Sequence, residues 1–237
     1  MCRWSLVRNT LRSWPPNRAW TCGLLRCLTP GLVASLLSLS LRFLTAGQPP
    51  LRLFTTDDGL VRNWIEHIRT DSRGFLWFCT VEGISIFDGS HFTNFTVRDG
   101  LPNRLAIDMV ESWTGDYWIA TADGLSLFHT VAKTGSSHFE NFRMAASGEA
   151  NEIDSLFEDS KHILWLGTGA GLFRSRTPGA AAVSFEPVPS GTCPRERVSA
   201  LLEDSRHRIW AGGLHGVSLL FPDGRCEHFG IEQGIRD

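Results

Sequence analysis

Four tryptophans recur at nearly even spacing, and this repeat constrains the fold of the chain more than any other feature. They are Trp77, Trp118, Trp165 and Trp210, separated by 41, 47 and 45 residues. Each is followed six residues later by a glycine and preceded nine residues earlier by a large aliphatic residue. The glycines are Gly83, Gly124, Gly171 and Gly216, and the aliphatic residues are Ile68, Met109, Leu156 and Leu201. A fixed period of this length is typical of architectures that repeat one supersecondary unit.

The first copy of the repeat predicts a meander of four short antiparallel strands. We expect these strands at residues 64–70, 75–80, 84–87 and 91–96. The stretch from Asp71 to Gly74 supplies turn residues, and the apolar run that follows is typical of a strand buried on both faces. Gly83 allows a positive φ, and Asp88-Gly89 is a hairpin signal. Four strands in a period of 41 to 47 residues match one β-propeller blade.

The predicted fold is therefore all-β, with four four-stranded antiparallel propeller blades within residues 48–237. The blades are expected at residues 64–96, 104–142, 152–188 and 197–229. The position two residues after each tryptophan is small, which suits inner strands that crowd near a propeller axis; these residues are Cys79, Ala120, Gly167 and Gly212. Four tryptophans in one register favour packing between adjacent blades over a platform for ligands.

Two sequence motifs accompany the tryptophans. Residues 198–205 read Val-Ser-Ala-Leu-Leu-Glu-Asp-Ser, residues 153–160 read Ile-Asp-Ser-Leu-Phe-Glu-Asp-Ser, and residues 95–103 read Phe-Thr-Val-Arg-Asp-Gly-Leu-Pro-Asn. These stretches resemble the repeat and the inter-blade link of the two-component regulator propeller family, and the resemblance covers residues 51–237. The departures from the family pattern are Ser112 at the aspartate position and His162 and His207 at the glycine position.

The resemblance implies an extracytoplasmic propeller that senses a ligand in two-component signal transduction. In that family the ligand is often of polysaccharide origin, and the signal passes to a histidine kinase or another output domain. The family motif specifies blades and assigns no ligand-binding residue, so the binding residues stay unknown. The connections 129–138 and 176–197 are candidates for ligand contact because their length varies between copies.

The first 47 residues predict a signal peptide or an N-terminal anchor. They contain six arginines and no acidic residue, and the 14 residues from Leu28 to Leu41 are apolar or small except for a few hydroxyl groups. Small residues follow at Thr45 to Gly47, which is the layout of an export signal. The apolar centre is short for a membrane span of about 20 residues. We expect a periplasmic or extracytoplasmic location, with a disordered cytosolic leader as the alternative.

The ends of the repeat region predict an incomplete ring. Residues 51–55 resemble the fourth strand of a blade without its first three strands, and residues 230–237 resemble the start of a further blade. A seven-bladed ring would need roughly 300 residues at this period. We therefore expect a fragment whose partners are missing downstream blades and an output domain, with a closed four-bladed ring as the alternative. Exposed strand edges would favour association, for example as a dimer.

Charge and cysteine spacing exclude several function classes. The formal net charge of −2 gives no reason to expect nucleic acid as a partner, since such binding normally needs a basic face. No cysteine pair has the spacing of a zinc or redox site. We expect no catalytic residue, cofactor or metal, while a Cys193–Cys226 bridge is left open. A propeller lyase or glycosidase is one alternative, although Asp71, Asp159 and Asp204 recur as turn residues. A protein-interaction scaffold of the WD-repeat kind is another, although that repeat's signature residues are absent.

Overall fold

The computed structural model describes residues 51–131, 137–146, 148–178, 184–189 and 196–235. The chain divides into two units, Met1–Arg52 and Leu53–Asp237, and all the described strands belong to the second unit. The leader that we predict at residues 1–47 lies outside the described residues. None of the described helices has the length and apolar character that crossing a membrane requires.

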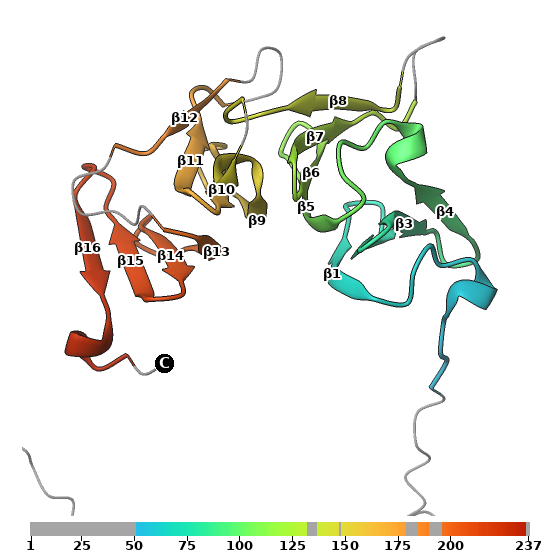
Figure 1. Cartoon of the computed structure of the whole chain (residues 1–237), viewed down its shortest axis with the longest axis horizontal. Helices are drawn as coiled ribbons and strands as arrows, with labels where there is room; N and C mark the ends of the chain where they lie inside the picture. Colours follow the sequence, from blue (N-terminus) through green and yellow to red (C-terminus); the bar gives the residue numbers. More distant parts are fainter. Residues whose placement is uncertain (1–50, 132–136, 147, 179–183, 190–195, 236–237) are drawn as a thin grey trace, which may run out of the picture. The chain divides into compact units, whose positions relative to one another are not determined.

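Sixteen strands in the described residues form four sheets, which we number as blades in chain order (Figure 1). The first blade comprises β1 (Ile65–Thr70), β2 (Leu76–Thr80), β3 (Gly83–Phe87) and β4 (Phe92–Phe95). The second comprises β5 (Ala106–Glu111), β6 (Tyr117–Thr121), β7 (Gly124–Phe128) and β8 (Phe139–Phe142). The third comprises β9 (Ile153–Glu158), β10 (Leu164–Thr168), β11 (Gly171–Ser175) and β12 (Phe185–Pro187). The fourth comprises β13 (Val198–Glu203), β14 (Ile209–Gly213), β15 (Gly216–Leu220) and β16 (Cys226–Phe229).

Within every blade the strands pair antiparallel in chain order, so each sheet is a meander. Successive blades contact each other through their first strands, β1 with β5, β5 with β9 and β9 with β13. The four sheets are not closed into a ring. The all-β prediction of four four-stranded antiparallel blades in an incomplete propeller is confirmed, and the alternative of a closed four-bladed ring is wrong.

A glycine at the start of each third strand permits the tight turn from the second strand. Gly83, Gly124, Gly171 and Gly216 all have φ between 116° and 135°. A Cβ atom at Gly83 would lie 2.2 Å from the carbonyl oxygen of Phe95, and the equivalent distance from Gly216 to Phe229 is also 2.2 Å. The constant spacing from tryptophan to glycine therefore marks, at least at Gly83 and Gly216, a position where only a residue without a side chain fits.

The tryptophans pack between blades, as the repeat predicts. Trp77 is fully buried in a cluster with residues of the second blade, among them Met109 and Tyr117. Trp118 lies in a cluster with β9 and β10, and Trp165 lies in one with β14 to β16. The second and third blades thus cover the preceding blade with the residues on either side of their own tryptophan, and the fourth blade does so with Ile209.

The outer faces of the first and fourth blades are less covered than the faces between blades. Ile68 is 55% exposed, whereas its equivalent Met109 is 2% exposed. On the fourth blade Trp210 is only partly buried, and its cross-strand neighbour Leu202 is 59% exposed. Both faces therefore present apolar side chains of the kind that is buried at the inner interfaces.

The inter-blade link has one structure in three places. A 3₁₀ turn forms at Thr56–Asp58 (η2), Val97–Asp99 (η3) and Ile231–Gln233 (η5), and a glycine with positive φ ends each turn. Residues 51–55 are not assigned to a strand. The orphan strand at 51–55 and the start of a further blade at 230–237 stay predictions.

Candidate functional site

An aspartate organises the first turn of three blades. In the first blade Asp71 Oδ1 accepts hydrogen bonds from the backbone N–H groups of Arg73 (3.0 Å) and Phe75 (2.9 Å). Its Oδ2 accepts the indole N–H of Trp77 at 3.1 Å. Asp159 and Asp204 make the same three contacts in their own blades. The prediction that these aspartates are turn acceptors is confirmed, and each also fixes the tryptophan six residues later.

A glutamate directly before the turn joins each blade to the preceding one. Ser72 donates its N–H and hydroxyl to Glu111 of the second blade, at 2.6 and 2.7 Å. Ser160 donates in the same way to Glu203 of the fourth blade, and Glu158 accepts the backbone N–H of Trp113 at 3.0 Å. Glutamate stands directly before this turn in three of the four repeats, at Glu111, Glu158 and Glu203. Their constant place before the turn was the signal that could have revealed the contact.

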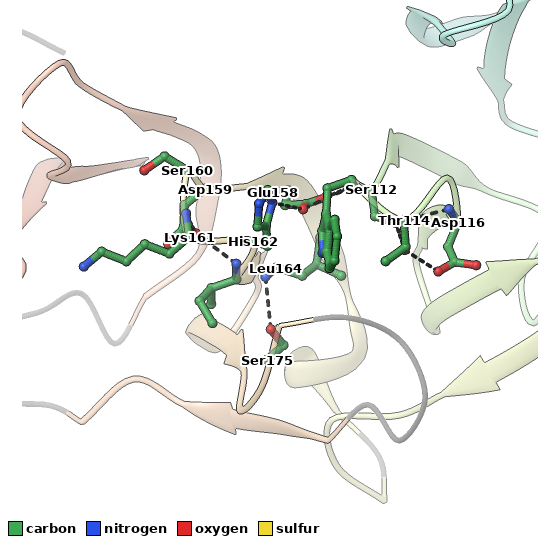
Figure 2. A network of polar contacts seen from close by, with 12 residues as sticks. Ser112, Thr114, Asp116, Glu158, Asp159, Ser160, Lys161, His162, Leu164 and Ser175 are labelled. Atoms are coloured by element: carbon green, nitrogen blue, oxygen red, sulfur yellow. Dashed lines mark hydrogen bonds and ion pairs between the residues drawn. The ribbon is translucent and has the colours of Figure 1, made fainter.

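The two histidines at the glycine position support these glutamates. His162 and His207 adopt positive φ values of 63° and 58°. His162 Nδ1 lies 3.1 Å from Glu158 (Figure 2). Its ring centroid lies 4.7 Å from that of Trp113, so the histidine contacts both partners of the inter-blade hydrogen bond. Among the described residues, no group of three or more histidine, cysteine, aspartate or glutamate side chains is placed to hold a metal ion.

The space between the first two blades, beside the turn, is filled by side chains. The Tyr117 ring stacks on Trp77 with 4.7 Å between centroids, and its hydroxyl donates to Asp71 at 3.2 Å. Burial and the Asp71 charge raise the pKa of Tyr117 to about 12, so the phenol stays neutral. Arg73 forms an ion pair with Asp71 (2.8 Å) and lies 5.4 Å from the centre of the Tyr117 ring. Together Tyr117 and Arg73 close this interface.

The equivalent space between the third and fourth blades is open. Ile209 takes the place of Tyr117, since both directly precede the tryptophan of their blade, and Lys161 takes the place of Arg73. A pocket of about 350 Å³ lies here. Its apolar wall includes Ile163, Trp165, Ile209 and Leu220, and its ionisable residues are Asp159, Lys161, Arg174, Glu203 and His207.

Most charged groups of this pocket are engaged by protein partners. Arg174 pairs with Glu186 at 3.0 Å. Burial by itself would raise the pKa of Glu203, but hydrogen bonds from Ser160 and His207 outweigh it and hold that pKa below its usual value. The Lys161 amino group makes no hydrogen bond or ion pair within the described part of the chain, and in Figure 2 its side chain extends away from the other labelled residues. Lys161 is therefore an exposed lining residue of the pocket whose amino group has no partner among the described residues.

The two connections expected as ligand-contact candidates are only partly described. From the connection at 176–197, Val188 and Pro189 line the pocket. From the connection at 129–138, His129, Thr130 and Val131 line a separate hollow of about 190 Å³ beside the second blade. The parts at 132–136, 179–183 and 190–195 lie outside the described residues.

Larger extracellular domains contain blades of the same kind. One is the extracellular domain of the hybrid two-component system BT3049 from B. thetaiotaomicron, with a TM-score of 0.60, 22% identity and coverage of 76% of this chain and 24% of that chain. The extracellular domain of the BT4673 system from the same organism matches with a TM-score of 0.60 and 19% identity, over 77% of this chain and 23% of that chain. The chain thus spans about a quarter of the length of these domains. No family model and no curated protein matches the sequence.

An enzyme shares the blade as well. Virginiamycin B lyase from Staphylococcus aureus matches with a TM-score of 0.56 and 13% identity, over 70% of this chain and 55% of that chain. Because signalling domains and a lyase share this architecture, likeness at such identities defines a fold and leaves the activity to the site. The chain has the β-propeller blade fold found in the extracellular domains of two-component systems.

Proposed function

We propose that this chain is the ligand-sensing propeller portion of an extracytoplasmic sensor in two-component signal transduction. The observation that supports it most is the array of four blades, which resembles the extracellular domains of two such systems in fold. Its partners are a small ligand, carbohydrates included, and further blades with an output domain such as a histidine kinase in a longer parent protein.

We propose a binding role without catalysis. The recurring aspartates that a glycosidase could use are occupied by turn N–H groups and by an indole N–H, as at Asp71 and Asp159. Carboxylates fixed in this way act as structural acceptors, whereas glycoside hydrolysis needs a pair of carboxyl groups facing one substrate. The lyase alternative draws only on a shared fold.

An extracytoplasmic location agrees with the state of Cys226. This residue is disulfide-bonded, and disulfides persist mainly in oxidising compartments. Cys193 lies outside the described residues, so the pairing of Cys193 with Cys226 stays a prediction. Residues 1–47 are the proposed signal peptide or anchor.

A reporter fusion tests the location. Alkaline phosphatase joined to the end of the full chain is active in a bacterial host only after export, because its disulfides form outside the cytoplasm. We expect phosphatase activity from the full chain and its loss when residues 1–47 are deleted. Equal activity of the two fusions, or none from the full chain at normal protein levels, would contradict the proposal.

A further inference from the structure

We propose that the pocket between the third and fourth blades binds a small ring compound with one carboxylate, which pairs with Lys161 while its ring lies against Ile209 and Leu220. This proposal rests on the proposed function only in taking the ligand to be a signal. The binding itself is a separate claim with its own measurement.

The carboxylates next to Lys161 are already engaged by other groups of the protein. Asp159 Oδ1 accepts the backbone N–H groups of Lys161 and Ile163, both at 2.9 Å, and its Oδ2 accepts the Trp165 indole N–H at 2.8 Å. Glu203 is likewise occupied by Ser160, at 2.7 Å. With these acids engaged, the ammonium group is left to pair with a ligand, and a carboxylate would form a charge-assisted hydrogen bond with it.

The shape of the pocket limits the rest of the ligand. Its volume of about 350 Å³ lies within the range of roughly 300–1,000 Å³ that small-molecule sites occupy. Ile209 and Leu220 line the pocket, and their accessible edges form an apolar wall for a compact ring. Arg174, the other permanent cation, is already held by Glu186 at 3.0 Å. A second anionic group would therefore find no free cation, so one carboxylate is the expected number.

The first interface shows that this repeat can close the same space with its own side chains. There Tyr117 stacks on Trp77, and Arg73 pairs with Asp71. At the third interface isoleucine stands where the first has tyrosine, and lysine where the first has arginine, and the pocket lies at these two positions. The chain itself thus supplies a variant that closes the pocket, Lys161→Arg with Ile209→Tyr.

Isothermal titration calorimetry on the full chain tests the proposal with two matched pairs of probes. Glucuronate is paired with glucose, and cyclohexanecarboxylate with cyclohexanol. We expect at least one carboxylate to bind saturably, and at least about tenfold more tightly than its neutral counterpart. Lys161→Met should weaken that binding by about tenfold or more. Arg206→Met removes the cation at the equivalent turn position of the fourth blade, outside the pocket, and should leave binding unchanged.

The closing variant provides a second measurement. Lys161→Arg/Ile209→Tyr should keep the far-ultraviolet circular dichroism of the parent and lose the binding. Preference for glucuronate would make the ligand an acidic sugar, and preference for cyclohexanecarboxylate an apolar acid; both lie within the proposed class. The proposal is overturned if neither carboxylate binds at millimolar concentration, if the neutral compounds bind equally well, or if Lys161→Met has no effect. The export reporter is independent of all these results, so failure here leaves the proposed location standing.

Discussion

A single buried carboxylate holds the first turn of a blade together. Asp71 is 5% exposed and accepts hydrogen bonds from two backbone N–H groups and one indole N–H. Burial acts to raise its pKa, but the hydrogen bonds from Arg73, Phe75 and Trp77 outweigh burial and hold the pKa below its usual value. The aspartate of the repeated Asp-Ser pair therefore stabilises the first turn of the blade.

Removing this carboxylate should be costly. In Asp71→Ala the buried indole N–H of Trp77 and two turn N–H groups lose their acceptor, so we expect the free energy of unfolding to fall by about 2–4 kcal/mol. Glu66→Ala, at an exposed position, should change it by less than about 0.5 kcal/mol. Urea denaturation followed by tryptophan fluorescence measures both. Equal effects of the two substitutions would contradict the role of Asp71.

The contribution of Asp71 should depend on pH. Its pKa is lower in the folded state than in the unfolded state, so acid protonates the unfolded chain first. The difference in unfolding free energy between the parent and Asp71→Ala should be largest above pH ~4, near the unfolded pKa of Asp. It should shrink as the pH falls through the folded pKa. A difference that stays constant from pH 6 to pH 3 would show that the charge of Asp71 does not stabilise the turn.

At the scale of the element, the hairpin between the second and third strands depends on its glycine. Gly83 combines a φ of 130° with a backbone oxygen that a Cβ atom would approach to 2.2 Å. Gly89, in the next hairpin of the same blade, has a φ of 100° but no atom within 4 Å of that position. Substitutions at these two glycines therefore distinguish the effect of close packing from the effect of backbone conformation.

Alanine at these two positions should give different losses of stability. Gly83→Ala must both strain the backbone and push the third strand away from Phe95 at the end of the fourth strand, at a cost of about 3 kcal/mol or more. Gly89→Ala strains only the backbone and should lower the free energy of unfolding by about 1 kcal/mol. Thermal unfolding by circular dichroism compares them. Equal melting temperatures of the two variants would show that the close contact with Phe95 is not the reason for glycine at position 83.

The sequence predicts the four-stranded blades and their first turns, because each blade repeats the same local chemistry. The spacing of Trp77 and Trp118 located the blades, and the Asp-Ser turns were recognised as acceptors. The contacts from Ser72 to Glu111 and the pocket at Lys161 could not be predicted in the same way. They depend on which residues of neighbouring blades face each other, and this register is set by three-dimensional packing. The exchange of tyrosine for isoleucine before the tryptophan was visible in the sequence, but its meaning required the interface.

At the scale of the whole molecule, the outer faces of the first and fourth blades should favour association. Ile68 and Leu202 are 55% and 59% exposed on faces that neighbouring blades cover elsewhere. We expect the full chain to self-associate at micromolar concentration, because exposed apolar faces and strand edges attract partners. Ile68→Glu/Leu202→Glu should reduce association in sedimentation velocity, and Val97→Glu, on an exposed link, should not. A parent chain that stays monomeric at high concentration would contradict this expectation.

We expect the four equivalent blades to lie side by side in a regular array. Pulsed electron spin resonance between spin labels, attached through unnatural amino acids at positions 73, 114, 161 and 206, measures this most directly, since these positions occupy equivalent turns. We expect one shared distance for the neighbouring pairs 73–114, 114–161 and 161–206. The pairs 73–161 and 114–206 should share one longer distance. Neighbouring pairs with clearly different distances would contradict it.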